Sequence, residues 1–129
     1  MKQTDISEWF KEHDIEEIEV IVPDMAGVAR GKMLPAEKFL EQSTMRLPES
    51  VFTQTVTGEF LNEPVINPAD RDILVRPDLN TLRRLPWTKD PAATVINDCY
   101  YEDGSAVDIS PRQVLKNVLN AYEASNMVP

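Results

Sequence analysis

Arg30 and Lys32 belong to the stretch whose residue types and spacing are best suited to chemistry, residues 23–35. Ahead of these two cations, Pro23, Asp24 and Gly27 follow an apolar run. Proline fixes its own φ, aspartate favours local turn hydrogen bonds and glycine permits a positive φ, so the pattern predicts a hairpin turn followed by a second strand. Side chains alternate between the two faces of a strand, so Arg30 and Lys32 should share one face. The spacing alone is explained by a surface hairpin on which Arg30 and Lys32 are solvated cations.

Three other kinds of residue could do chemistry, and each has a plainer explanation. Five carboxylates between residues 12 and 19 could suggest a cation site, but metal ligands must converge, whereas carboxylates that alternate along a strand form a solvated face. His13 is expected at a helix end or on the surface, because a catalytic histidine needs an orienting group. Cys99 lies in an apolar run and is expected to be a small buried hydrophobe. The five carboxylates are Glu12, Asp14, Glu16, Glu17 and Glu19.

The composition predicts a soluble cytoplasmic domain. A chain of 129 residues is large enough for one domain with its own core. No apolar run approaches the roughly 20 residues that span a bilayer, and the first residues lack the apolar core of a signal peptide. The net charge of −9 argues against nucleic-acid and anionic-membrane partners, which need a basic surface. A single cysteine excludes an intramolecular disulfide and suits a reducing compartment.

Helices and strands are expected to alternate along the chain, because some segments carry apolar residues at helical spacing and others are alternating or β-branched. The order predicts an α+β domain with a mixed sheet that covers a helix. Helices are expected from Thr4 or Asp5 to about residue 13, at residues 35–40 and at residues 111–125. Strands are expected at residues 15–22, in the second half of the hairpin, and at residues 51–56, 73–75, 82–86 and 92–99, with residues 45–49 as a linker.

The last helix has the clearest start, because Ser110 offers a hydroxyl N-cap and Pro111 suits the first helical position. The two tryptophans, Trp9 and Trp87, are expected to anchor a core rather than to form a ligand platform. One apolar stripe is expected along the last helix. It consists of Val114, Leu115, Val118, Leu119 and Tyr122.

The hairpin sequence Asp24-x-x-Gly27-x-x-Arg30-Gly31-Lys32 resembles the first hairpin of the small N-terminal β-grasp domain of glutamine synthetase-type enzymes, most of all the branch that includes the γ-glutamylpolyamine synthetases. The resemblance implies an α+β fold with a β-grasp-like mixed sheet packed against a helix. It divides the chain into a β-grasp N-terminal domain at residues 1–110 and a linker helix at residues 111–129, which leads toward a catalytic domain absent from this sequence. Further family landmarks occur in the family's order, at residues 72–78, Thr81, 85–87, 93–95, 103–104 and 110–115.

The resemblance also implies where the chemistry is done. In this family, glutamate is joined to an amine through a γ-glutamyl phosphate, with ATP and Mg²⁺ or Mn²⁺ held largely by the catalytic domain. The present chain has one histidine and no phosphate-binding loop, because Gly31-Lys32-Met33 lacks the earlier glycine at the required spacing. We therefore expect no catalytic residue, metal ligand, bound cofactor or ligase activity in this chain alone. The implied partners are its own catalytic domain, neighbouring subunits in a ring-shaped homo-oligomer, glutamate and an amine.

A loop of this domain reaches the active site of the neighbouring subunit in the family. In ammonia-using members it carries Phe-Asp-Gly-Ser-Ser, whose aspartate helps to bind ammonium, with a tryptophan further on. Here Thr53 stands at the aspartate and Phe60 at the tryptophan. A hydroxyl is a weaker partner for a small cation than a carboxylate, which favours a larger amine such as a polyamine. The expected substrate-binding residues are Thr53, Gln54, Thr55, Glu59 and Phe60, with Glu59 as a replacement charge.

Two alternatives remain open at this point. Residues 53–60 are either a recognition loop or simply a strand end and a loop with Phe60 in a local core. The chain is either the N-terminal domain of a ligase or a stand-alone β-grasp module that binds a protein partner without catalysis.

Overall fold

A mixed sheet with helices at its edges forms the framework of the chain. The structure is a computed structural model that describes residues 3–60 and 70–128. In these residues the α-helices and strands are α1 (Gln3–Glu12), β1 (Glu17–Pro23), β2 (Ala29–Pro35), α2 (Ala36–Glu41), β3 (Met45–Pro48), β4 (Asp72–Pro77), β5 (Arg83–Leu85), β6 (Ala92–Tyr100) and α3 (Pro111–Ala124). Two 3-10 turns, Glu49–Phe52 and Leu79–Thr81, flank β4 in the sequence. This architecture confirms the predicted α+β class.

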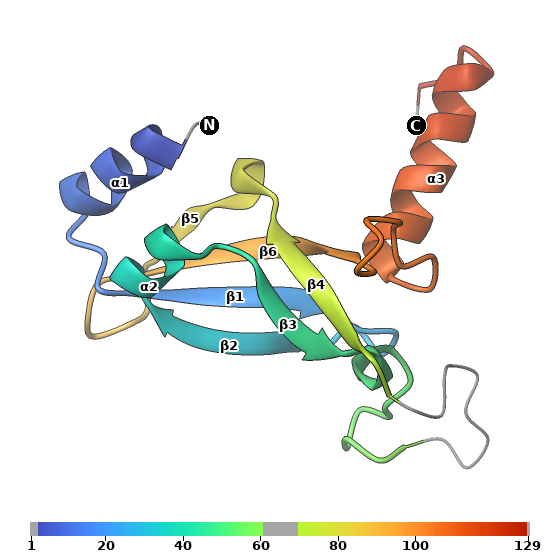
Figure 1. The fold of residues 1–129 in the computed structure, drawn as a ribbon. Coiled ribbons are helices and arrows are strands. Elements are labelled where there is room, and N and C mark those ends of the chain that lie inside the picture. Colours follow the sequence, from blue (N-terminus) through green and yellow to red (C-terminus); the bar gives the residue numbers. More distant parts are fainter. Residues whose placement is uncertain (1–2, 61–69, 129) are drawn as a thin grey trace.

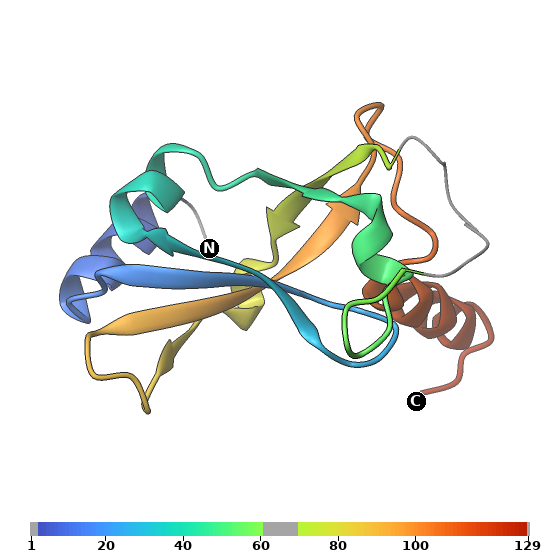
Figure 2. The same cartoon turned by 90° about the horizontal axis from the view of Figure 1, so that it is seen from below.

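The long strand β6 joins the two halves of the sheet. Within the described residues the strand order is β2-β1-β6-β4-β3, and β5 also pairs with β6. The first part of β6 runs parallel to β1, whereas β4 pairs antiparallel with its last part, from Asn97 to Tyr100. The two halves diverge along β6, so that β3 and β4 turn away from β1 and β2 (Figures 1 and 2). The sheet therefore has two separate packing faces.

Each half of the sheet has its own buried cluster. Ile6 and Phe10 of α1 and Phe39 of α2 pack with Ile18 and Val20 of β1. This contact confirms the predicted apolar face of the first helix, although α1 begins at Gln3, so that Thr4 and Asp5 lie inside the helix rather than at its N-cap. The second cluster contains Val22, Leu47, Val51, Phe52, Ile73, Val75, Cys99 and Val107. Burial of Cys99 confirms the prediction of a small buried hydrophobe.

Residues 45–56 differ from the prediction in two places. Met45–Pro48 is not a linker but strand β3, antiparallel to β4. Residues 51–56 do not form a strand, because Val51 and Phe52 enter the second cluster from a 3-10 turn. The β-branched content of this segment favoured a strand, but β-propensity depends strongly on tertiary context. The buried position of Phe52, which is 1% exposed, outweighs that local preference.

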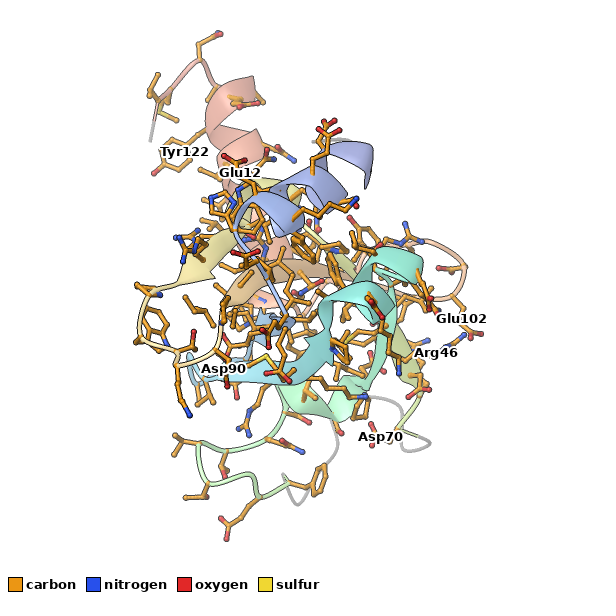
Figure 3. All side chains as sticks on the ribbon, turned by 90° about the vertical axis from the view of Figure 1, so that its left-hand side faces the viewer. Glu12, Arg46, Asp70, Asp90, Glu102 and Tyr122 are labelled. Atoms are coloured by element: carbon orange, nitrogen blue, oxygen red, sulfur yellow. The ribbon has the colours of Figure 1, made fainter. Side chains whose placement is uncertain are left out.

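Helix α3 confirms the predicted start at Pro111, but its N-cap differs from the expectation. Ser110 occupies the N-cap position without making a side-chain cap bond. The apolar stripe is exposed, with Leu115 57% and Val114 49% accessible. Figure 1 shows α3 projecting away from the sheet, and Figure 3 shows Tyr122 far along the helix from it. None of the described helices is long and apolar enough to cross a membrane.

The two tryptophans have different environments. Trp9 packs against the first core cluster, as predicted, and its ring stacks on His13 at 4.5 Å between centroids. His13 accordingly lies just beyond the end of α1, where its Nδ1 is 2.8 Å from the carbonyl oxygen of Trp9. Trp87 is 77% exposed in the connection between β5 and β6, so the prediction of a core anchor was wrong there. The short connection places Trp87 beyond the packed faces of the sheet.

Candidate functional site

The turn between β1 and β2 is built around the carboxylate of Asp24. One oxygen, Oδ1, accepts hydrogen bonds from the backbone N–H groups of Ala26 at 2.9 Å and Val28 at 2.8 Å. Gly27 has φ +77°, the conformation for which glycine is favoured, and its N–H donates to the Asp24 carbonyl. These bonds confirm the predicted hairpin turn. Asp24 is only 2% exposed, and these hydrogen bonds to its carboxylate compensate for its burial.

The same carboxylate orients Arg30. Nε of Arg30 donates to Oδ2 of Asp24 at 2.8 Å. Burial raises the pKa of Asp24, but the bonds from Arg30, Val28 and Ala26 more than offset this, so that the pKa lies below its ordinary value. The carboxylate is therefore charged near neutral pH and holds the guanidinium in one orientation.

Arg30 connects this hairpin to the loop on which the predicted substrate-binding residues lie. Its Nη2 donates to the carbonyl oxygen of Thr55 at 3.0 Å. Thr55 lies 25 residues further along the chain, and no local pattern in the sequence indicates this contact. The structure therefore brings together two segments that the sequence marked for separate reasons, one for its cations and one for its similarity to an amine-binding loop.

Residues 53–60 form a tight turn closed by backbone hydrogen bonds. The N–H of Thr55 donates to the carbonyl of Glu59 at 2.9 Å, and the N–H of Gly58 donates to the carbonyl of Thr55 at 2.9 Å. A β-bridge pairs Gln54 with Phe60. The hydroxyl of Thr55 accepts from the N–H of Glu59 at 3.1 Å. The loop is thus a small hairpin whose neck is at residues 54, 55, 59 and 60.

The five predicted substrate-binding residues have different positions in this hairpin. Thr53 is half-buried at its base, where the hydroxyl donates to the carbonyl of Ser50 at 3.2 Å. Gln54 and Thr55 are half-buried at the neck, whereas Glu59 is exposed. Phe60 is 63% exposed, so the alternative in which it belongs to a local core is wrong. An exposed carboxylate and an exposed aromatic ring therefore lie next to each other in the sequence, available for contact.

A buried glutamate that sequence reasoning missed fixes the base of the loop. Glu49, 1% exposed, accepts hydrogen bonds from Nε of Arg71 at 2.9 Å and from the Tyr101 hydroxyl at 2.7 Å. The Arg71 guanidinium also lies 3.8 Å from the centre of the Tyr101 ring. Burial and the Glu49 carboxylate both raise the pKa of Tyr101 above its ordinary value. The three residues are too far apart in the sequence for any spacing rule to reveal them.

Helix α3 is attached to the sheet by a second charged cluster. Arg112 donates to Asp98 at 3.0 Å and to Asp78 at 2.6 Å, and Lys116 donates to Asp98. Burial raises the pKa of Asp98, but Lys116 and Arg112 together bring it below the ordinary value. Arg112 was part of a family landmark in the sequence, and the structure shows that it holds the first turn of the helix.

The described residues contain no cluster of side chains that could bind a metal ion. Within residues 3–60 and 70–128, no group of three or more histidine, cysteine, aspartate and glutamate side chains could hold a metal ion. Burial raises the pKa of the Cys99 thiol to about 12, which keeps it protonated at neutral pH. The described part of this chain therefore does not fit a divalent metal site.

Curated proteins that resemble the chain include ligases that act on glutamate and amines. It is 27% identical over 124 residues to a glutamate–isopropylamine ligase from Pseudomonas sp, a match that covers 92% of this chain and 27% of that protein. It is 34% identical over 112 residues to the gamma-glutamylethanolamide synthetase GlnA4 of Streptomyces coelicolor, covering 82% of this chain and 24% of that protein. No protein-family model matches the chain. The chain spans about a quarter of the length of these curated relatives.

Solved structures have the same fold over most of the chain. A glutamine synthase homolog superposes with a TM-score of 0.76 at 20% identity, covering 86% of this chain and 27% of that one. The GmaS complex with ADP superposes with a TM-score of 0.69 at 28% identity, covering 95% of this chain and 26% of that one. The fold is that of the N-terminal domain of glutamine synthetase-like proteins, as the sequence predicted. Glutamine synthetase-type ligases are among the homologues and structural neighbours of this chain.

Proposed function

We propose that this chain is the N-terminal domain of a longer ATP-dependent glutamate–amine ligase of the glutamine synthetase type. The observation that carries the proposal is the asymmetry of coverage: a ligase of this type matches 92% of the present chain, but the match occupies 27% of the ligase. A complete small protein would more naturally match relatives of its own length. The rest of the proposed enzyme would hold glutamate, ATP and Mg²⁺ or Mn²⁺, since the described residues here do not fit a metal site.

The proposed role of this domain is to form one wall of the active site of a neighbouring subunit in a ring-shaped homo-oligomer. Loops on rigid scaffolds commonly carry recognition, and the hairpin at residues 53–60 is held at its base by Phe52 and at its neck by Arg30. The exposed apolar stripe of α3 supports contact with a further domain, because large contiguous apolar patches usually mark an interaction surface. A cytoplasmic location is part of the proposal.

The amine that we propose is a primary amine larger than ammonium, with polyamines included. Thr53 replaces the carboxylate expected of ammonia-using members, and its hydroxyl is engaged with the Ser50 carbonyl. Glu59 offers one exposed carboxylate for an alkylammonium group, and the exposed Val56 and Phe60 offer apolar surface for its carbon chain. The names of two relatives, which refer to isopropylamine and to an ethanolamide, agree with such a substrate.

The test uses the full-length product of the gene with glutamate, ATP and Mg²⁺. Phosphate release would be compared for ammonium, isopropylamine, ethanolamine, putrescine and spermidine. We expect release with one or more organic amines and little with ammonium, and a Glu59→Gln variant should raise the KM for the amine. Glu37→Gln, which removes an exposed carboxylate on α2, is the matched control. Ammonium as the best substrate would overturn the amine assignment, and the absence of release with any amine would overturn the proposed activity.

A further inference from the structure

The guanidinium of Arg30 bridges the β1–β2 hairpin and the loop at residues 53–60. Nε is bonded to the Asp24 carboxylate at 2.8 Å, and Nη2 is bonded to the Thr55 carbonyl at 3.0 Å. The Asp24 side chain is 0% exposed and the Arg30 side chain 22% exposed, so the bridge is largely shielded from water. Shielding strengthens a charge-assisted hydrogen bond relative to one in solvent.

Asp24 gives this bridge a fixed origin. Its other oxygen is bonded to the N–H groups of Ala26 and Val28, so the carboxylate cannot rotate without breaking the turn. The planar guanidinium then presents its remaining N–H groups in one direction. A lysine in place of Arg30 could bond to Asp24 or to the Thr55 carbonyl, but its single ammonium group lacks the fork that spans both.

The acceptor, Thr55, is the residue on which the loop hairpin closes. Its N–H is bonded to Glu59, and its carbonyl accepts from Gly58 as well as from Arg30. The side chain of Val56, beyond this neck, is 68% exposed, and that of Phe60, at the neck itself, is 63% exposed. A segment with few buried contacts depends for its position on the contacts at its neck. Displacement of the Thr55 carbonyl would therefore carry Glu59 and Phe60 with it.

We propose that Arg30, oriented by Asp24, is a positioning residue for the loop at residues 53–60 and thereby sets where Glu59 and Phe60 meet the amine. This inference rests on the proposed function for its catalytic consequence, whereas its structural part stands on the contacts alone. Arg30 does not touch the reacting atoms in this scheme. Its effect reaches the amine through the carbonyl of Thr55.

Arg83 provides a matched control. Its Nε also donates to a backbone carbonyl, that of Thr81, at 3.0 Å. Arg83 lies on β5, at the end of the sheet opposite the loop (Figure 1). The same substitution, arginine to lysine, can therefore be made at a second arginine that bonds to a backbone carbonyl and lies at a different location.

The first experiment is amide hydrogen exchange on the 129-residue chain. We expect Arg30→Lys and Arg30→Gln to speed the exchange of the Thr55 and Gly58 amides at least about tenfold relative to amides of β6, because one charge-assisted bond is lost at the neck. Arg83→Lys should leave both loop amides unchanged. Unchanged loop exchange in both Arg30 variants would overturn the inference, whatever the activity of the enzyme. Should one Arg30 variant fail to fold, the other and Asp24→Asn test the same bridge.

The second experiment separates positioning from general structural damage in the full-length product. We expect the Arg30 variants to raise the KM for the amine on the order of tenfold and to change the ratio of kcat/KM between two amines, while the KM for glutamate stays within about twofold. An equal loss of kcat with every amine, at unchanged KM for the amine, would overturn the role of Arg30 in recognition. If the full-length product uses no amine at all, the proposed function fails, but the exchange experiment still decides whether Arg30 positions the loop.

Discussion

Gly31→Ala should be the most damaging single methyl addition in the β1–β2 hairpin. Gly31 pairs with Ile21 in the antiparallel register of β1 and β2. A Cβ atom at Gly31 would lie 1.9 Å from the carbonyl oxygen of Val20 and 2.9 Å from its carbonyl carbon. Both atoms are backbone, so no side chain can rotate away to make room.

The size of the effect follows from the shift that is needed. Carbon and oxygen atoms approach no closer than about 3.3 Å, so β2 must move by roughly 1.4 Å at this point. Such a shift takes neighbouring ladder bonds from about 2.9 Å past the roughly 3.5 Å at which they cease to be hydrogen bonds. Loss of two to three bonds at about 1 kcal/mol each, together with loosened packing, gives a destabilisation of roughly 2–4 kcal/mol.

The measurement is urea unfolding of the 129-residue chain, followed by circular dichroism. Gly27→Ala is the control, because Gly27 has φ +77° but nothing within 4 Å of an added Cβ. That variant introduces only the strain of a left-handed conformation, about 1–2 kcal/mol. If Gly31→Ala lowered the unfolding free energy less than Gly27→Ala does, the argument that close strand approach requires glycine at residue 31, rather than conformational freedom, would be refuted.

Three further predictions concern the charged clusters and the last helix. Glu49→Gln should lower the pKa of Tyr101, which burial and Glu49 raise, and ultraviolet titration of the phenol would detect the change. In the parent chain the raised pKa of Tyr101 contributes stability below about pH 10, and this stability is lost as the pH rises through the pKa of Tyr101 in the folded state. Asp24 and Asp98 have lowered pKa values in the folded state, so they should contribute stability above about pH 4 that is lost as the pH falls through those values. Asp98→Asn should therefore flatten the dependence of the unfolding free energy on pH in acid, and an unchanged slope would contradict this. The side chain of Leu115 on α3 is 57% exposed, so Leu115→Gln should change the unfolding free energy of the 129-residue chain by less than about 1 kcal/mol. The same substitution in the full-length product should reduce assembly or thermal stability. Equal effects on the 129-residue chain and on the full-length product would argue against a covered helix face.

Features with local causes could be predicted from the sequence. The turn at residues 24–27 follows from an aspartate that bonds to nearby N–H groups and from a glycine that tolerates a positive φ, and both bonds occur within four residues. The start of α3 follows from Pro111, which needs no N–H partner there. The α+β class follows from the order of alternating and helical segments. These features depend on neighbours in the chain, so the residue pattern contains the necessary information.

Only the tertiary structure decided the geometry of the candidate site. Val51 and Phe52 belong to a 3-10 turn instead of a strand because Phe52 is buried and Glu49, in the same turn, is bonded to Arg71 and Tyr101, 22 and 52 residues away. The contact of Arg30 with Thr55 spans 25 residues and uses a backbone carbonyl, which every residue possesses and no sequence pattern marks. Such contacts depend on the tertiary arrangement, in which β3 and β4 turn away from β1 and β2. The sequence alone predicted which loop would recognise an amine, whereas the packing of the sheet determined that Arg30 bonds to that loop.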